Sequence, residues 1–374
     1  MSQPGAKRSL RGAAIAVACA CLAGPAAAGA NEDRARDFTQ DLPGMERSDR
    51  IAQSGHAEFE TGAIRAPARF DMVGVARERD AVEIRVRERG GWSEWVETEN
   101  GDPLYTGGSR VVQVRSHERL GGGELHYVSL PEPGPLPVAM RSSASERRGG
   151  VPKPKFVGRR QWGADERRGG CIPRDRPTKG RVKAGVIHHT VTANDYSEAE
   201  APGIVLGICR FHRNANGWDD IGYNALVDRF GNLYEGRGGG VNRAIVGAQA
   251  EGHNLQTAGV ASIGDHRSEA PTGPAKRAIV RYLAWRLDLA GIEAIGKTWL
   301  TSSGGQTTRT DDGDRIRVNR ILSHSDINFT ECAGTLLRAK LAAIRRSVQA
   351  KMDEYGDGGG EPAPPDEGSG GTAP

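Results

Sequence analysis

The chain has 374 residues, of which 37% are hydrophobic and 26% charged, and its formal net charge is +4. This length accommodates two domains of ordinary size plus tails, and the hydrophobic content suits globular cores but not a membrane bundle. The excess positive charge is small and is not gathered in a basic stripe, which argues against a nucleic-acid-binding protein.

The first 30 residues have the pattern of a secretory signal peptide. An Ala-rich apolar run, too short to span a bilayer, ends in the small-residue cleavage pattern Ala28-Gly29-Ala30. Cys19 and Cys21 lie inside this run, so a lipoprotein anchor is the alternative. Cleavage would remove three cations and no anions, so the net charge of the mature chain would be +1. The signal peptide predicts that this mature chain is secreted to the cell wall. The three cations are Lys7, Arg8 and Arg11.

Two segments with different patterns follow. Residues 31–55 are charged and irregular, which is typical of a flexible lead-in. Residues 56–135 contain short apolar segments, and their period-two alternation predicts a small all-β, sandwich-like domain. The clearest alternation is Val82, Glu83, Ile84, Arg85, Val86 and Arg87. Trp92 and Trp95 follow a Gly-Gly turn and either form a platform on which a sugar stacks or pack in the core or at a strand edge.

Residues 136–155 are rich in Pro and Gly and are predicted to be a linker. Residues 156–352 interleave apolar strand patterns with amphipathic helix patterns. This alternation predicts an α/β domain with a central mixed β-sheet flanked by helices. Residues 353–374 are expected to be a disordered tail. Strands are expected up to His189 and at 221–227, 233–234 and 258–263, and helices at 197–214, 275–289 and 336–352.

Three residues suggest a metal site. His324 and Cys332 lie eight positions apart in a polar run, and His188 follows an apolar run that predicts a buried strand. Imidazole and thiolate are the ligands that tetrahedral zinc prefers, and three protein ligands leave one position open, as in catalytic sites. From spacing alone the alternative is equally good, because a single Cys or His is commonly a buried structural residue.

The mature chain keeps an odd number of cysteines in an oxidising compartment, namely Cys171, Cys209 and Cys332. If Cys332 binds zinc, Cys171 and Cys209 remain to form a disulfide with each other. Two separate buried thiols are the alternative.

Five motifs, in this order, make residues 156–350 resemble the peptidoglycan recognition protein family within the type 2 N-acetylmuramoyl-L-alanine amidases. The two-domain layout resembles secreted actinobacterial members. The motifs are Arg160-Gln161-Trp162-Gly163-Ala164, Ile187-His188-His189-Thr190, Gly217-Trp218-Asp219-Asp220-Ile221-Gly222-Tyr223-Asn224, Tyr234-Glu235-Gly236-Arg237-Gly238 and Thr330-Glu331-Cys332.

The resemblance implies a Zn²⁺ held by His188, His324 and Cys332, with Tyr223 as the active-site tyrosine. Tyr223 would donate a hydrogen bond to the bound water or to the developing oxyanion, or else be a buried aromatic residue. Thr330 would assist near the oxyanion or fix the turn before Cys332. Four further residues are expected to line the groove for the glycan strand and stem peptide, although packing roles are equally possible for the first and last of them: Trp162, His212, Arg237 and Asn254.

The sequence departs from the family pattern at three places. Ser323-His324-Ser325-Asp326 replaces the family's Gly-His-Arg-Asp, Gln249 replaces a His after Gly-Ala, and Gly238-Gly239 replaces a Gly-Trp pair. The ligands are unaffected, so the changes bear on stem-peptide selectivity and turnover. A monomeric amidase that acts on peptidoglycan is therefore expected. A binding-only recognition module, which would typically lack the Cys ligand, and another envelope zinc peptidase are the alternatives.

Overall fold

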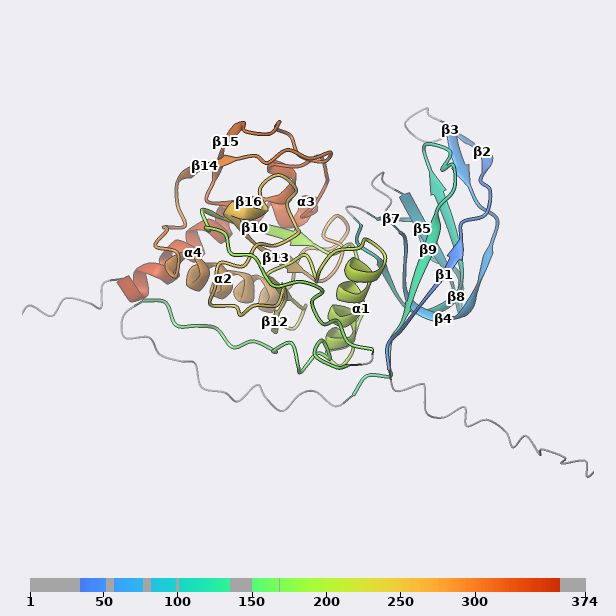
Figure 1. Cartoon of the computed structure of the whole chain (residues 1–374), viewed down its shortest axis with the longest axis horizontal. Helices are drawn as coiled ribbons and strands as arrows, with labels where there is room; N and C mark the ends of the chain where they lie inside the picture. The colour runs from blue at the N-terminus through green and yellow to red at the C-terminus, as the bar shows by residue number, and fades with distance from the viewer. Residues whose placement is uncertain are drawn as a thin grey trace, which may run out of the picture.

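The computed structural model describes residues 34–51, 57–76, 82–98, 101–134, 150–167 and 169–356. The predicted signal peptide, most of the predicted linker and residues 357–374 lie outside this part of the chain. A strand-rich domain lies beside an α/β domain, with helix α1 between the two (Figure 1). Among the helices of the described residues, none combines the length and apolar character that a membrane-spanning segment needs.

The N-terminal domain, called the β-domain below, is a nine-stranded antiparallel sheet in the order β1-β9-β4-β8-β3-β2, to which β5, β6 and β7 are joined through β8. The predicted alternation in β5 is confirmed, because Val82, Ile84 and Val86 are buried and Glu83 and Arg85 are not. The strands form one branched sheet and not two separate ones, because the long strand β8 pairs with β3, β4 and β5. The strands are β1 Arg36–Asp41, β2 Glu46–Ile51, β3 Ala57–Glu60, β4 Ile64–Val75, β5 Val82–Glu88, β6 Gly91–Trp92, β7 Val96–Thr98, β8 Leu104–Ser116 and β9 Glu124–Ser129.

The prediction of an irregular lead-in over residues 31–55 is wrong for β1 and β2. Strand β1 pairs with β9 along its whole length, from Arg36 opposite Ser129 to Asp41 opposite Glu124. A strand at the edge of a sheet keeps one exposed face, so a charged composition does not prevent pairing. The partner strand lies almost ninety positions away, and the local pattern that we used carries no information about it.

The two tryptophans of the β-domain have their rings covered by arginines. The guanidinium carbon of Arg85 lies 4.9 Å from the ring centre of Trp92 and 4.4 Å from that of Trp95, and Arg115 lies 4.6 Å from Trp95. Cation–π stacking of this kind stabilises the packing of the strands. The structure therefore favours the packing alternative over a sugar platform.

The C-terminal domain has the predicted mixed sheet, in the order β12-β11-β13-β10-β16. Only β12 is antiparallel to its neighbour. Ile187 and Val260 pack on one face with α2 and α4, and Leu226 and Ala261 pack on the other face with α1. The elements are β10 Ala184–His189, α1 Ala201–Asn214, β11 Ala225–Val227, β12 Leu233–Glu235, η2 Asn254–Gln256, β13 Thr257–Ser262, α2 Gly273–Asp288, β14 Lys297–Thr301, β15 Arg315–Asn319, β16 Ile321–Ser323, η3 His324–Asp326, α3 Thr335–Arg338 and α4 Leu341–Gly356.

Two details of the C-terminal domain differ from the prediction. The single helix expected over 336–352 is divided into α3 and α4, and no Pro in the sequence marks the division. The hairpin of β14 and β15 was missed, although Ile316 and Val318 alternate with charged residues there. This hairpin places Leu300 and Val318 against Val186 and covers part of the sheet next to β10.

The two domains share a hydrophobic core. Met72 and Val128 of the β-domain belong to the same buried cluster as Ile204 and Ile208 of α1. Gly207 permits the close approach of α1, because a Cβ atom there would collide with the side chain of Met72. A buried apolar contact of this kind fixes one domain against the other. The β-domain is therefore packed directly against the α/β domain.

Candidate metal centre

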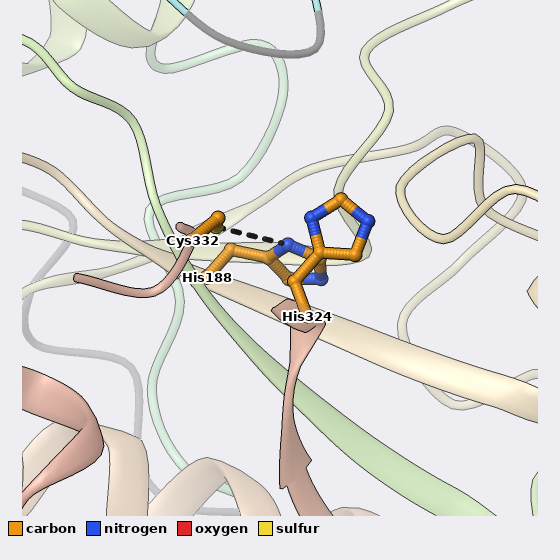
Figure 2. Close-up of side chains that lie close together, drawn as sticks. All are labelled: His188, His324 and Cys332. Carbon is orange, nitrogen blue, oxygen red and sulfur yellow. Dashed lines mark hydrogen bonds between the residues drawn. The ribbon is translucent and has the colours of Figure 1, made fainter. Parts of the chain in front are cut away.

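The sheet itself brings the two candidate histidines together. Strands β10 and β16 are parallel neighbours with Ile187 opposite Ser323, so the residues that follow these positions, His188 and His324, lie at the same edge of the sheet. Their ring centres are 4.6 Å apart (Figure 2). Carboxyl ends of parallel strands are a common place for functional groups in α/β proteins.

Cys332 returns to the histidines through a short, tightly bonded loop. Its Sγ lies 3.6 Å from Nδ1 of His188 (Figure 2), and the ligand atoms of the three residues all lie within 4.8 Å of one another. Its carbonyl oxygen accepts hydrogen bonds from Ser323 Oγ at 3.0 Å and from the backbone N–H of Ser325 at 2.8 Å. These bonds close the segment on itself, so the thiol is held over the end of β16.

Burial keeps both imidazoles neutral. His188 and His324 are buried, and desolvation lowers the pKa of His188 to about 3 and the pKa of His324 well below its ordinary value. The neutral imidazole is the form that binds a metal. Both histidines are thus ready to act as ligands at neutral pH.

The three residues fit a zinc ion. His188 donates its Nε2 proton to Oε1 of Gln249, which leaves the Nδ1 lone pair on the side of Cys332. Nδ1 of His324 is buried and has no hydrogen-bond partner among the described residues. Ligand atoms around a tetrahedral zinc lie about 3.5 Å apart, and two imidazole nitrogens plus a thiolate are an ordinary zinc ligand set. The separation of 3.6 Å between Cys332 Sγ and His188 Nδ1 agrees with this geometry, and a ring nitrogen of His324 lies within 4.8 Å of the other two ligand atoms.

Gln249 orients the candidate ligand His188, a role that was not predicted from the sequence. Its amide nitrogen donates to Oγ1 of Thr257 at 3.0 Å, which fixes the amide so that its oxygen faces His188. Such partners of metal-binding histidines set the tautomer and the ring orientation. The departure from the family pattern at this position therefore keeps a hydrogen-bond partner for the ligand.

His189 lies on the opposite side of β10. Its Nδ1 accepts a hydrogen bond from the backbone N–H of His266 at 3.1 Å. Successive side chains of a strand point to opposite faces, so His188 and His189 cannot both reach one ion.

Tyr223 lies beside the candidate metal centre, just before β11, and its ring centre is 5.2 Å from that of His188. Its hydroxyl donates to Oδ2 of Asp102 at 2.6 Å. Asp102 lies between β7 and β8 of the β-domain, and its Oδ1 accepts from Nε2 of His212 at 2.7 Å. Asp102 was not predicted from the sequence, because no motif marks the segment Gly101-Asp102-Pro103 as part of a site in another domain.

The remaining predicted site residues make internal contacts. Trp162 is buried and donates to the carbonyl oxygen of Glu235 at 2.9 Å, and Asn254 Oδ1 accepts from the backbone N–H groups of Gln249 and Ala250. Thr330 Oγ1 accepts from the backbone N–H of Cys332 at 3.0 Å, which favours its turn role. Contact of the predicted groove residues with a substrate stays a prediction. Arg237 is half-buried and donates to the carbonyl oxygen of Ile221 at 3.3 Å.

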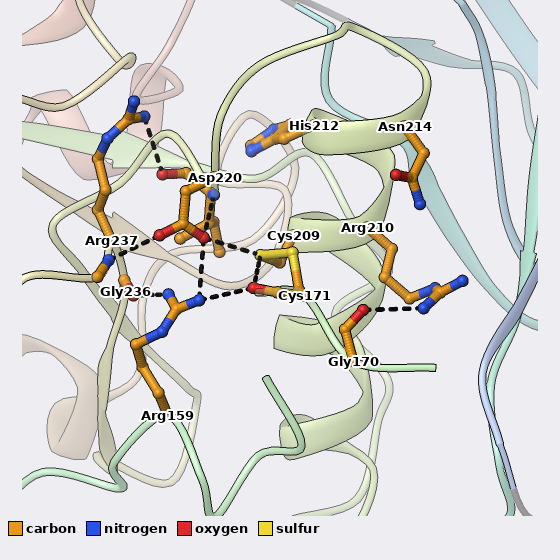
Figure 3. Close-up of a disulfide and its surroundings, with 12 residues drawn as sticks. Arg159, Gly170, Cys171, Cys209, Arg210, His212, Asn214, Asp220, Gly236 and Arg237 are labelled. Carbon is orange, nitrogen blue, oxygen red and sulfur yellow. Dashed lines mark hydrogen bonds and ion pairs between the residues drawn. A yellow bond between two sulfur atoms is a disulfide. The ribbon is translucent and has the colours of Figure 1, made fainter. Parts of the chain in front are cut away.

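The predicted disulfide between Cys171 and Cys209 is present (Figure 3). Their Cα atoms are 6.1 Å apart, and the bond ties the segment before β10 to α1 across 38 positions. Arg159 crosses the same region, where it donates to the carbonyl oxygen of Cys171 at 2.7 Å and to Asp220 at 3.1 Å. The disulfide therefore anchors the helix that carries His212.

Replacing Cys171 and Cys209 together by Ser is expected to lower the free energy of unfolding by about 2–4 kcal/mol, because the unfolded chain regains the entropy of a closed loop. Urea unfolding of the oxidised parent and of the double variant measures the difference. The double variant should keep its metal, since neither cysteine belongs to the candidate metal centre. Equal stability of the two proteins would show that the bond contributes nothing in solution.

The metal-free protein is expected to lose stability as the pH falls from 6.5 towards 3. The folded state keeps His188 and His324 neutral, whereas the unfolded chain protonates them below its pKa of about 6.5. The unfolded state then binds more protons, so each histidine lowers the stability by up to about 1.4 kcal/mol per pH unit in this window. Urea unfolding of the chelator-treated chain at pH 7.5, 6.0 and 5.0 tests this. Stability that stays constant or rises over this range would contradict it.

Comparison with known proteins shows that this chain is similar to peptidoglycan amidases and recognition proteins. Residues 178–335 match the model of the N-acetylmuramoyl-L-alanine amidase family Amidase_2, and the chain therefore contains a domain of this family. The matched segment includes His188, Tyr223, His324 and Cys332.

The relatives include a protein named as an amidase and a protein named for peptidoglycan recognition. The chain is 38% identical over 195 residues to a porcine (Sus scrofa) N-acetylmuramoyl-L-alanine amidase, a match that covers 52% of this chain and 31% of that protein. It is 32% identical over 161 residues to peptidoglycan-recognition protein LE of Drosophila melanogaster, covering 43% of this chain and 39% of that protein. The chain thus spans less than half of the length of these two relatives.

Among solved structures, a peptidoglycan recognition protein-LE in complex with tracheal cytotoxin, a monomeric diaminopimelic acid-type peptidoglycan, is 29% identical. The match has a TM-score of 0.39 and covers 50% of this chain and 92% of that chain.

Proposed function

We propose that this protein is a zinc-dependent N-acetylmuramoyl-L-alanine amidase, which hydrolyses the amide bond between the lactyl group of N-acetylmuramic acid and L-alanine in peptidoglycan. The observation that carries the proposal is the convergence of His188, His324 and Cys332 beside Tyr223 in a domain of the Amidase_2 family. The porcine relative named as an amidase is in accord with it.

The chain's own residues prepare the site for this reaction. His188, His324 and Cys332 would hold the ion, and Gln249 binds Nε2 of His188, so Nδ1 would be the atom left to hold the ion. When bound, zinc acts as a Lewis acid that lowers the pKa of a water molecule and polarises the amide carbonyl. Tyr223 places a phenol oxygen beside the reacting groups, where a hydrogen bond orients the attacking water or the substrate.

A binding-only recognition module is the second candidate, because the family relatives include proteins named for recognition. Such a module needs no metal, whereas in this chain two imidazoles and a thiol converge with their ligand atoms within 4.8 Å of one another. This convergence favours the enzyme.

The predicted signal peptide and the nature of the substrate support a proposal for where the protein acts. We propose that the chain is secreted and acts in the cell wall on the glycan strand with its stem peptide, as a monomer. A cell-wall substrate is a solid polymer, so the enzyme must meet it outside the membrane.

Incubation of the full chain with insoluble peptidoglycan tests the proposal. The enzyme should release soluble stem peptides, a chelator should stop the release, and added zinc should restore it. A recognition module would instead sediment with the polymer and release nothing, whether zinc is present or absent.

A further inference from the structure

We infer that the β-domain completes the active site and that Asp102 is the positioning residue it contributes, because its carboxylate binds the catalytic-site Tyr223 and His212 at once. This inference rests on the proposed amidase function and extends it to a domain that lies outside the matched family segment. We call this group of three side chains the Asp102 bridge.

Both carboxylate oxygens of Asp102 are used. Oδ2 accepts from the hydroxyl of Tyr223 at 2.6 Å, and Oδ1 accepts from Nε2 of His212 at 2.7 Å. All three side chains are buried, with 6% of Asp102, 5% of Tyr223 and 1% of His212 exposed. Hydrogen bonds to a carboxylate in a buried place are short and strong, so they hold the phenol in one orientation.

The partners of His212 fix the positions of the protons. Nδ1 of His212 accepts from the backbone N–H of Gly222 at 3.1 Å, so this nitrogen carries no proton and Nε2 carries the one that points to Asp102. Both donors of the bridge therefore face the carboxylate. His212 of α1 is thus hydrogen-bonded both to the segment before Tyr223 and to the β-domain.

The bridge decides how Tyr223 can act. A phenol has a single proton, and Tyr223 gives it to Asp102. Because this proton is committed to Asp102, any hydrogen bond that the phenol oxygen makes to the attacking water or to the amide N–H of the substrate must use an oxygen lone pair, with the phenol as acceptor. Tyr223 thus works as an oriented acceptor, and the donor role that the sequence analysis expected would require this hydrogen bond to break.

The loop that carries Asp102 is held on both sides. The carbonyl oxygen of Gly101 accepts from Nδ2 of Asn216 at 2.8 Å, just beyond the end of α1. Gly101 has φ +76°, and a Cβ atom there would collide with Asn216. On the other side, Arg267 donates to the carbonyl oxygen of Glu97 at 3.0 Å. With the shared hydrophobic core behind them, these contacts keep the carboxylate in place.

A double-mutant cycle on the full chain tests the bridge. Asp102→Asn keeps the size of the side chain, but an amide oxygen can accept from only one of the two fixed donors while its NH₂ group faces the other. We expect Asp102→Asn to lower kcat about tenfold or more, with KM changed less than about threefold, since one oriented hydrogen bond in the reaction is lost. In the Tyr223→Phe background the same change should cost less than about threefold, because Asp102 acts through the phenol.

Tyr105→Phe is the matched control. It removes another hydrogen bond across the same domain interface, from the Tyr105 hydroxyl to Oε1 of Glu200 at 2.9 Å, without touching Tyr223. Its kcat should stay within about twofold of the parent, as expected for a change remote from the reacting groups. An equal loss in Tyr105→Phe, an additive effect of Asp102→Asn and Tyr223→Phe, or no effect of Asp102→Asn would each overturn the inference.

The same four proteins of the cycle also give a readout that does not depend on turnover. Urea unfolding should show that the two substitutions are coupled by about threefold or more in the unfolding equilibrium constant. If the parent releases no stem peptide, the proposed function fails and the positioning role fails with it, whereas the coupling still decides whether the bridge exists. An active parent without coupling overturns the bridge alone.

Discussion

Cys332→Ser is expected to lose its zinc and its peptidoglycan hydrolysis together. Serine presents a neutral hydroxyl in place of a soft thiolate, and it is a poor zinc ligand. The remaining imidazoles of His188 and His324 leave the ion with too few protein ligands to be retained. Loss of an outer partner of a metal ligand costs about 10–100-fold in affinity, so loss of a ligand itself should exceed that range.

Elemental analysis of the purified variant, with a parallel assay of stem-peptide release, measures both effects. Gln249→Ala is the graded control, because it removes the hydrogen-bond acceptor of His188 Nε2 but leaves the three candidate ligands in place, and it should weaken zinc binding by the smaller factor of about 10–100. A Cys332→Ser protein with full zinc occupancy would show that the thiol is no ligand, and the site would have to be reassigned.

Tyr223→Phe is expected to keep its fold and its zinc while losing about a hundredfold or more in kcat. The hydroxyl of Tyr223 donates to Asp102, which is not a candidate ligand, and Nε2 of His188 is held by Gln249. Loss of one hydrogen bond made in the transition state typically costs a factor of this size. Rates of peptide release at saturating substrate, with zinc content measured on the same samples, test it.

A Tyr223→Phe protein that cleaves as fast as the parent would refute the role of this residue and leave the metal site standing. A variant that loses its zinc would instead place the phenol in the support of the ligands. Unfolding curves of the parent and of Tyr223→Phe, measured at the same pH, show whether the variant is folded, so that a loss of zinc or activity is not mistaken for a general loss of structure.

The candidate metal centre was predictable because each of its three side chains follows a recognisable local feature. The apolar run up to His189 indicates a buried strand, and His324 and Cys332 share one short polar segment. Strands β10 and β16 are parallel neighbours, and this pairing alone brings His188 and His324 to the same edge of the sheet. The disulfide followed from the count of cysteines once Cys332 was set aside for the metal.

The parts that the sequence did not reveal depend on contacts between distant segments. Strand β1 is charged and is defined by pairing with β9, and its only large apolar side chain, Phe38, stacks on Tyr127 at 5.0 Å between ring centres. Asp102 lies 121 positions before the tyrosine it binds. Burial of Asp102 depends on the contact of the β-domain with α1, which no periodicity within either domain expresses.

Identification of the bond that is cut is the most direct test of the proposed function. The full chain, loaded with zinc, is incubated with purified cell wall, and the soluble and insoluble products are analysed by mass spectrometry. We expect stem peptides with a new free L-alanine amino terminus and intact glycan strands. New reducing ends on the glycan, or new amino groups only within the stem peptide, would contradict the account and identify a glycosidase or an endopeptidase instead.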